Sequence, residues 1–109
     1  MFEYNAIVTA VYDGDTITAD IDLGFYSWRK NERFRLFGID APEVRGKERP
    51  DGLKTRDWLR TRILGKKVLL KSIKDKKGKY GRWLATVFDD EGDVIEDMIE
   101  LGLAERKEY

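Results

Sequence analysis

The sequence predicts a mainly β fold with helices (α+β), in which five short strands form a small barrel. Two observations predict this fold. Short runs of β-branched and aromatic residues are separated by Gly, Asp and Asn turn signals, and two further segments carry apolar residues at helical spacing. The chain has 109 residues and a hydrophobic fraction of 41%, which is enough for one core, so we expect a single domain over residues 1–109.

The elements follow one another along the chain. The expected strands cover residues 6–12, 16–23, 33–37, 68–73 and 83–88, and the expected helices cover residues 52–64 and 94–99. The first two strands are rich in strand-forming residues and flank the Asp-Gly turn signal at residues 13–14. Residues 24–31 connect strands two and three. This second hairpin would have an aromatic and basic tip with Phe25, Tyr26 and Trp28.

The helices are expected after strand three and after strand five. Asp51 could cap the first helix, in which Leu59 and Ile63 lie one turn apart, and Gly65 supplies a stop signal. The basic stretch over residues 74–81 is expected to form the turn before the last strand. Because open sheet edges are aggregation sites, five strands with one helix after strand three and a short C-terminal helix suit a closed OB-fold barrel.

The residue types that the chain lacks narrow its chemistry. It contains no His and no Cys, which removes the usual general base, a thiolate nucleophile and every nitrogen or sulfur metal ligand. A metal site would have to be built from oxygen atoms, which suits Ca²⁺, Mg²⁺ or Mn²⁺ and argues against zinc. Catalysis would have to use carboxylates, Lys, Arg, Tyr, hydroxyl groups or a bound cation.

Charge is distributed unevenly, although 21 basic residues balance 21 acidic ones. Residues 65–82 hold eight basic residues against one acidic residue, whereas residues 83–109 hold two basic against nine acidic ones. The basic block could contact a polyanion, or it could be a solvated turn with lysines on an exposed strand face. No apolar run approaches the roughly 18 residues of a membrane span. Without a signal-peptide pattern we expect a cytoplasmic or other intracellular protein, although a secreted mature form would look the same.

Three segments carry the candidate chemistry. Residues 13–16 (DGDT) begin the second strand, residues 35–43 (RLFGIDAPE) end the third, and residues 79–82 (KYGR) open the fifth. In a barrel these strand ends can converge on one side. They would then form a cation site flanked by guanidinium groups, built from Asp15, Arg35, Asp40, Glu43 and Arg82.

Hydrolysis of a phosphodiester needs such groups, because the attacking water must be positioned and deprotonated while negative charge grows on the phosphoryl oxygens. Two aspartates can hold a hard cation, a third carboxylate can activate water, and arginines have forked donors that match phosphate. Each segment also has a structural interpretation. The Asp-Gly pair is a common hairpin turn, Arg35 could pair with a surface carboxylate, and Asp40 could bond the turn backbone. The functional interpretation therefore depends on all three segments occurring together.

These segments resemble the staphylococcal-nuclease-like family, also called thermonucleases. The resemblance is carried, in order and with compatible spacing, by residues 13–16 (DGDT), 35–43 (RLFGIDAPE), 79–82 (KYGR) and 101–104 (LGLA). It covers residues 6–104 and implies an OB-fold barrel. It also implies a Ca²⁺-dependent nuclease, a hydrolase that cuts phosphodiester bonds of DNA and RNA at the P–O5′ bond and leaves 3′-phosphates. The cofactor would be one Ca²⁺ ion rather than Mg²⁺ or Mn²⁺.

The resemblance implies a role for each matching residue. The catalytic residues would be Arg35, Glu43 and Arg82, with Glu43 activating the water and the arginines stabilising the transition state. The calcium ligands would be Asp15, Asp40 and the backbone carbonyl of Ala41, supported by Asp13 and Thr16. Substrate contacts would come from Lys79 and Tyr80 and, out of register with the family's stacking tyrosines, from Tyr109.

One departure from the family concerns partners. The hairpin over residues 23–31 is longer than in the secreted bacterial members, and its aromatic residues could stack on bases or pack against the barrel or a second subunit. We therefore expect a monomer, or a dimer through the aromatic hairpin, that acts on DNA or RNA, preferably single-stranded. Two other functions stay open, namely a non-catalytic OB-fold module that binds nucleic acid and a protein-interaction module that uses the hairpin.

Overall fold

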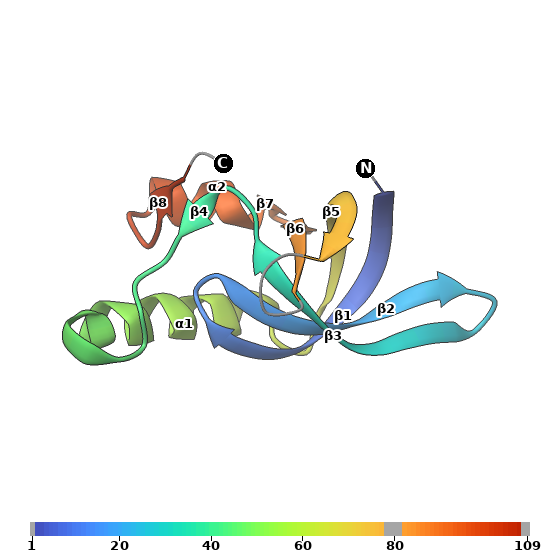
Figure 1. Ribbon diagram of the computed structural model, residues 1–109, viewed down its shortest axis with the longest axis horizontal. Coiled ribbons are helices and arrows are strands. Elements are labelled where there is room, and N and C mark those ends of the chain that lie inside the picture. The colour runs from blue at the N-terminus through green and yellow to red at the C-terminus, as the bar shows by residue number, and fades with distance from the viewer. Residues whose placement is uncertain (1, 78–81, 108–109) are drawn as a thin grey trace.

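The computed structural model, which describes residues 2–77 and 82–107, contains a five-stranded barrel with two helices packed on it (Figure 1). The barrel strands are β1 (Phe2–Asp13), β2 (Thr16–Gly24), β3 (Ser27–Leu36), β5 (Lys67–Lys77) and β6 (Trp83–Asp89). The remaining elements are β4 (Ile39–Asp40), the 3₁₀ helix η1 (Gly46–Glu48), α1 (Arg49–Ile63), β7 (Gly92–Asp93), α2 (Val94–Glu100) and β8 (Glu105–Arg106). The expectation of an OB-fold barrel of the α+β class is confirmed.

A parallel pairing closes the barrel. The strands follow the order β3-β2-β1-β5-β6 through antiparallel pairs, and β3 then pairs with β6 in parallel. Side chains alternate between the two faces of each strand, so Ile17, Ala19 and Ile21 of β2 are buried in the interior together with Leu36 and Leu70 from other strands. The residues between these positions face outward, and this outer face carries the site described below.

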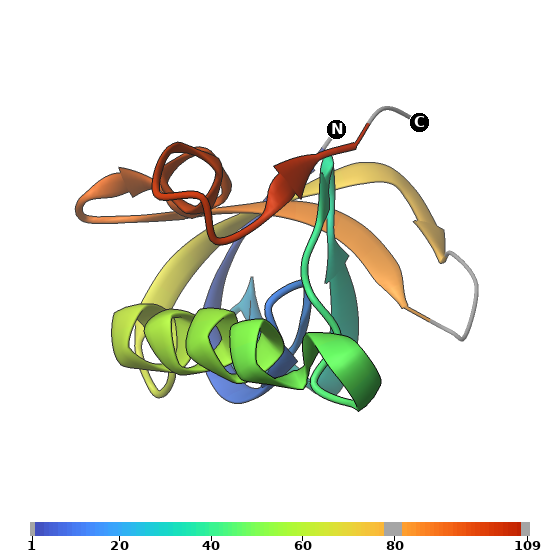
Figure 2. The same cartoon turned by 90° about the vertical axis from the view of Figure 1, so that its left-hand side faces the viewer.

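The two helices pack on different sides of the barrel. Figure 2 shows α1 lying across one side of the sheet, with α2 on a separate side of it. The packed face of α1 contains Leu59 and Ile63, and that of α2 contains Val94 and Met98, all fully buried. The stop signal at Gly65 is confirmed, since this residue has a φ of +76° and follows the last turn of α1. Within residues 2–77 and 82–107, no helix has the length and apolar character needed to cross a membrane.

The start of α1 differs from the sequence prediction. The helix begins at Arg49, three residues earlier than expected, and directly continues η1. Asp51 therefore lies within the first turn, and the N-cap position is taken by Glu48, whose side chain makes no capping hydrogen bond. Pro50 in the first turn explains the earlier start, because its ring fixes φ at a helical value and its missing N–H would have had no helical partner there.

The second hairpin also differs from the prediction. β3 begins at Ser27, so residues 28–31 belong to the strand and only Phe25 and Tyr26 form the tip. Asn31 has a φ of +56° and lies at a register shift between β2 and β3, which interrupts the alternation that reveals a strand in the sequence. The hairpin projects from the barrel, as Figure 1 shows, and places both tip aromatics fully in solvent.

Two further differences concern the ends of strands. β5 extends to Lys77, so the first half of the stretch expected to be a basic turn is strand, and residues 78–81 lie outside the described residues. The pair of β4 and β8 was not expected. It sets Asp40 opposite Glu105, and the N–H of Lys107 donates to the carbonyl oxygen of Gly38 at 2.8 Å. These contacts hold the C-terminal segment against β4, the strand that contains Asp40.

The guanidinium of Arg62 links α1 to β6 and α2 through ion pairs. Its Nε lies 2.5 Å from Oδ2 of Asp89 and 3.1 Å from Oε2 of Glu91, and its Nη2 lies 2.9 Å from Oδ2 of Asp97. The group also lies over the ring of Trp58, with 5.4 Å between Cζ and the ring centroid. The hydrogen bond from Arg62 holds the pKa of Asp89 below its usual value. This network fastens α1 to β6 and α2.

Replacement of Arg62 by methionine is expected to lower the free energy of unfolding by about 2 kcal/mol at pH 7, because it leaves the mostly buried carboxylate of Asp89 without its partner. The lowered pKa of Asp89 means that its ionised form favours folding above the ordinary value of 3.8, and this contribution is lost as the pH falls through the lowered value. The difference between wild type and variant should therefore shrink below about pH 4. Urea unfolding of wild type and variant at neutral and acid pH measures this difference in free energy. A difference that does not depend on pH would show that the Arg62–Asp89 ion pair is not its source.

Candidate active site

An open cleft with a volume of about 980 Å³ lies over the outer face of β1, β2 and β3. Of the predicted site residues, it brings together Asp13, Asp15, Thr16, Arg35, Asp40, Glu43 and Arg82. These residues come from strand ends and connections that are distant in sequence. The closure of the barrel through β3 and β6 is what places Arg82 beside the other residues.

Arg35 lies between two carboxylates. Its Nη1 is 3.3 Å from Oδ2 of Asp15 and its Nη2 is 3.6 Å from Oδ1 of Asp40, while Nη1 also donates to the carbonyl oxygen of Leu36 at 3.0 Å. The Arg35 side chain is only 13% exposed, so its orientation is held by these partners. The Asp40 side chain is 64% exposed and therefore open to a ligand in the cleft.

Asp15 is buried at the floor of the cleft. Its Oδ2 accepts a hydrogen bond from the N–H of Ala41 at 3.0 Å, and its Oδ1 accepts one from the hydroxyl of Thr16 at 3.3 Å. The turn from β3 is thus tied to the start of β2. Ala41 lines the neighbouring pocket instead of the cleft, and the role of its carbonyl as a metal ligand stays a prediction.

Asp13 is the second buried acid of this turn. Its Oδ1 accepts from the N–H of Asp15 at 3.1 Å. Burial, followed by the hydrogen bond and charge of the Asp15 carboxylate, raises the pKa of Asp13 to about 6. Two carboxyl groups in a desolvated site repel each other when both are ionised. A bound cation would relieve this repulsion, so the acidic pair is compatible with the predicted oxygen-based metal site.

Arg82 and Glu43 complete the cleft from two other segments. Nη1 of Arg82 donates to Oγ1 of Thr16 at 3.0 Å, which directs this guanidinium toward the start of β2. Glu43 is exposed on the connection between β4 and η1. Its backbone lies against α1 at Gly52, where an added Cβ would overlap the carbonyl oxygen of Glu43. The absence of a side chain at Gly52 therefore allows the helix to support the residue predicted to activate water.

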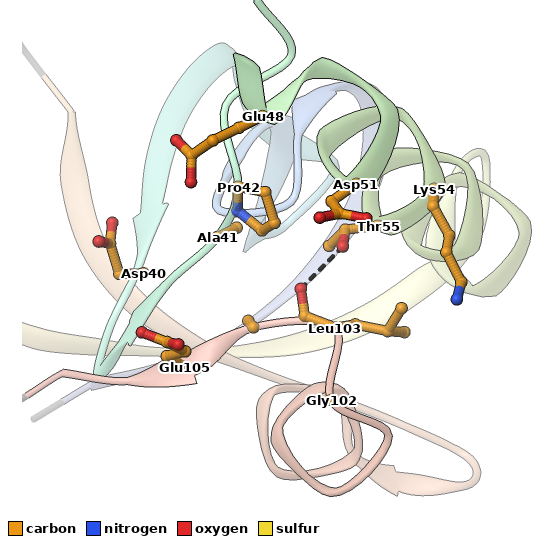
Figure 3. Close-up of a pocket in the computed structure, with 11 residues that line it drawn as sticks. Asp40, Ala41, Pro42, Glu48, Asp51, Lys54, Thr55, Gly102, Leu103 and Glu105 are labelled. Atoms are coloured by element: carbon orange, nitrogen blue, oxygen red, sulfur yellow. Dashed lines mark hydrogen bonds between the residues drawn. The ribbon is translucent and has the colours of Figure 1, made fainter.

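A smaller pocket of about 340 Å³ adjoins the cleft at Asp40 (Figure 3). Figure 3 shows β4 and β8 side by side, with Asp40 and Glu105 on the same side of the pocket. At its base the hydroxyl of Thr55 donates to the carbonyl oxygen of Leu103 at 2.7 Å. Within residues 2–77 and 82–107, no three carboxylates gather closely enough to hold a metal ion by themselves. A cation at Asp15 and Asp40 would therefore keep water among its ligands.

The cleft also contains residues that the sequence prediction did not include, and Tyr12, Arg33, Arg45 and Arg60 are the larger ones among them. Nη2 of Arg45 donates to the hydroxyl of Tyr12 at 2.8 Å, and Arg60 donates to the carbonyl oxygen of Val11 at 3.0 and 3.2 Å. The alternation of β3 could have identified Arg33, since it faces the same side as Arg35. The predicted substrate contacts Lys79, Tyr80 and Tyr109 lie outside the described residues.

Comparisons with known proteins agree on one family. A family model described as staphylococcal nuclease homologue matches residues 33–109. A thermonuclease of Staphylococcus hyicus is 33% identical over 105 residues, which cover 94% of this chain and 59% of the relative. A thermonuclease of Staphylococcus intermedius is 32% identical over 106 residues, with 94% and 60% covered.

A relative from outside the staphylococci also matches. An uncharacterized endonuclease of Escherichia coli O157:H7 is 34% identical over 98 residues, which cover 89% of this chain and 57% of the relative. The chain therefore spans between 57% and 60% of the length of these three relatives.

Proposed function

Because this chain belongs to the family of staphylococcal nuclease homologues, we propose that it is a nuclease that depends on a divalent cation and hydrolyses phosphodiester bonds of DNA and RNA. One observation carries the proposal. A single cleft gathers five arginines and four carboxylates from separate segments of the chain, and the guanidinium of Arg35 lies against Asp15 and Asp40. The relatives named thermonuclease and endonuclease support the same reaction class.

In this proposal, the predicted catalytic residues divide the reaction between them. Arg35 and Arg82 bind the scissile phosphate and stabilise the charge that grows on its oxygens. Glu43 accepts a proton from the attacking water, and its exposure in the cleft gives water access to it. Because Arg35 is already held by two carboxylates, its donors need little reorganisation when the phosphate arrives.

The proposed cation is Ca²⁺, with Asp15, Asp40 and the carbonyl of Ala41 as protein ligands and with Asp13 and Thr16 supporting Asp15. All available donors are oxygens, which fits a hard cation. When bound, the ion would supply charge stabilisation at the phosphoryl oxygen and a more acidic water. The guanidinium of Arg35 lies against both aspartates, so we expect it to share these carboxylates with the cation.

The finer features of the reaction are part of the proposal. We expect cleavage at the P–O5′ bond with 3′-phosphate products, and a preference for single strands, because an unpaired strand can enter an open cleft with its bases free to stack on aromatic side chains. Lys79, Tyr80 and Tyr109 are proposed to contact the substrate beyond the described part of the cleft.

The test is cleavage of single-stranded DNA and RNA by the full chain in the presence of Ca²⁺, compared with Mg²⁺, Mn²⁺ and an excess of chelator. We expect cleavage with Ca²⁺ and none with the chelator, and analysis of the product ends distinguishes 3′- from 5′-phosphates. Absence of cleavage with every divalent ion would overturn the enzymatic proposal in favour of a module that only binds nucleic acid.

Asp40→Ala is expected to weaken Ca²⁺ binding by 10-fold or more (about 1.4 kcal/mol), because it removes an accessible charged ligand. Arg35→Ala should bind Ca²⁺ at least as well as wild type, since it frees both aspartates, but should turn over slowly. Titration calorimetry measures both affinities. Glu105→Ala is the matched control. Glu105 also carries a carboxylate and lies opposite Asp40 in the register of β4 and β8, but it does not line the cleft. Unchanged affinity in Asp40→Ala would refute the ligand assignment.

A second candidate function is an interaction between two copies of the chain through the β2–β3 hairpin. Phe25 and Tyr26 at its tip are fully exposed and have φ values of +54° and +60°, a conformation that L residues adopt at a cost of roughly 1–2 kcal/mol each. Light scattering of wild type and of the double variant Phe25→Asn/Tyr26→Gly tests this candidate. The variant suits the turn, so loss of a dimer would report the aromatic rings and not misfolding.

A further inference from the structure

The cleft continues beyond the predicted catalytic residues. Across the outer faces of β1, β2 and β3, the register sets Asp13, Thr16 and Arg35 in one row. The adjacent row consists of Ala10, Thr18 and Arg33, which also line the cleft. Both rows come from the same three strands and face the same side of the sheet, so a ligand bound at the first row extends naturally over the second.

The spacing of the two arginines matches a repeating polyanion. Arg33 and Arg35 are two residues apart on β3, which separates their Cα atoms by about 7 Å. Successive phosphates of an extended nucleic acid strand are a comparable distance apart. A strand whose scissile phosphate lies at Arg35 would therefore bring a neighbouring phosphate to Arg33, where the hydroxyl of Thr18 offers a further donor.

An aromatic side chain borders this second row. Tyr12 is 52% exposed, and the donation from Arg45 to its hydroxyl fixes the position of the ring at the edge of the cleft. The two hydrogen bonds from Arg60 to the carbonyl oxygen of Val11 hold the backbone just before it. A half-exposed and anchored ring beside a cationic row has the features of a surface on which a base stacks.

We propose that Thr18 and Arg33 form a second phosphate subsite, which binds the phosphate adjacent to the scissile one on the same strand, while Tyr12 stacks on the neighbouring base. The inference rests on the proposed function, because the scissile phosphate defines the first subsite. Its consequence is that affinity increases when the substrate gains a second phosphate on the side of Arg33.

The test measures binding with a chelator present, so that hydrolysis does not contribute. A labelled oligothymidylate of ten nucleotides is the probe, and unlabelled competitors contain one, two or three phosphodiester groups. Arg33→Gln should raise the Kd for the probe about 10-fold and abolish the gain from the second phosphate, while the competitor with one phosphodiester binds as to wild type. Arg29→Gln is the matched control, because it removes an exposed arginine of the same strand that does not line the cleft.

Two further readouts separate a phosphate contact from a structural role. The slope of log Kd against log salt should fall by roughly 0.7 in Arg33→Gln, as expected for one lost phosphate contact on a single strand. Tyr12→Phe should keep most of the affinity for the oligothymidylate, because its ring still stacks on a base. Tyr12→Leu has no ring and should lose the contribution of stacking.

The outcomes distinguish this subsite from the proposed reaction. If Arg33→Gln and wild type show the same gain from the second phosphate and the same salt slope, the subsite is refuted whether or not the chain cleaves nucleic acid. If the chain binds as expected but cleaves nothing with any divalent ion, the subsite stands and the catalytic proposal fails.

Discussion

Glu43→Gln is expected to lower kcat on single-stranded DNA by about 10²- to 10⁴-fold. Glutamine keeps the size and the hydrogen-bonding reach of the side chain but cannot accept a proton from water at neutral pH. Because Glu43 is exposed and its support by α1 is through its backbone, the substitution should leave the fold and the Ca²⁺ affinity unchanged. Steady-state kinetics, thermal unfolding and calorimetric titration measure these three properties.

Glu48→Gln is the control for this prediction. Glu48 is an exposed carboxylate five residues further along the chain, at the end of η1, and it lines the neighbouring pocket instead of the cleft. Its replacement removes the same charge at a similar place and should change kcat less than about twofold. If both variants keep wild-type turnover, Glu43 is not the proton acceptor. If both lose it equally, the loss reflects net charge near the cleft and not proton transfer.

Gly52→Ala is expected to lower the free energy of unfolding by about 3 kcal/mol and to lower kcat as well. Elsewhere in a helix interior, alanine in place of glycine stabilises by up to about 1 kcal/mol. At this position an added Cβ would overlap the carbonyl oxygen of Glu43 and lie 2.5 Å from its carbonyl carbon. Backbone atoms cannot rotate away as a flexible side chain can. The helix or the connection has to shift, and Glu43 moves with it.

Chemical denaturation and activity at saturating Ca²⁺ measure the two effects. Lys54→Ala, on an exposed position of the same helix, should change stability by less than about 0.5 kcal/mol and leave kcat unchanged. A Gly52→Ala protein that is more stable than wild type would show that α1 does not press on the connection, and the proposed support of Glu43 would be wrong.

The barrel was predictable because its signals are local. Residues 16–22 of β2 alternate between half-exposed and buried positions, and Asp-Gly marks the turn before the strand, so both features appear directly in the sequence. Features that depend on distant partners were not predictable in this way. Asn31 interrupts the pattern of β3 through a register shift, and the pair of two-residue strands β4 and β8 is too short to leave a periodic signal.

The candidate site likewise contains residues that the sequence could indicate and residues that only the structure reveals. The residue types in DGDT and RLFGIDAPE, and the absence of His and Cys, indicated phosphate chemistry with oxygen ligands before any contact was known. The alternation of β3 placed Arg35 on an outer face and equally implied Arg33, which the motif alone does not single out. Tyr12, Arg45 and Arg60 carry no motif, because they reach the cleft only through contacts between segments.

The sequence by itself determined which side chains could do chemistry and which strands would carry them, since residue type and period-two alternation are local properties. Only the tertiary structure decided their convergence. Closure of β3 on β6 brings Arg82 to Thr16, and the packing of α1 against the connection at Gly52 positions Glu43. The physical reason is that these contacts are set by burial of the shared core around Ile17 and Leu59, which depends on the whole chain at once.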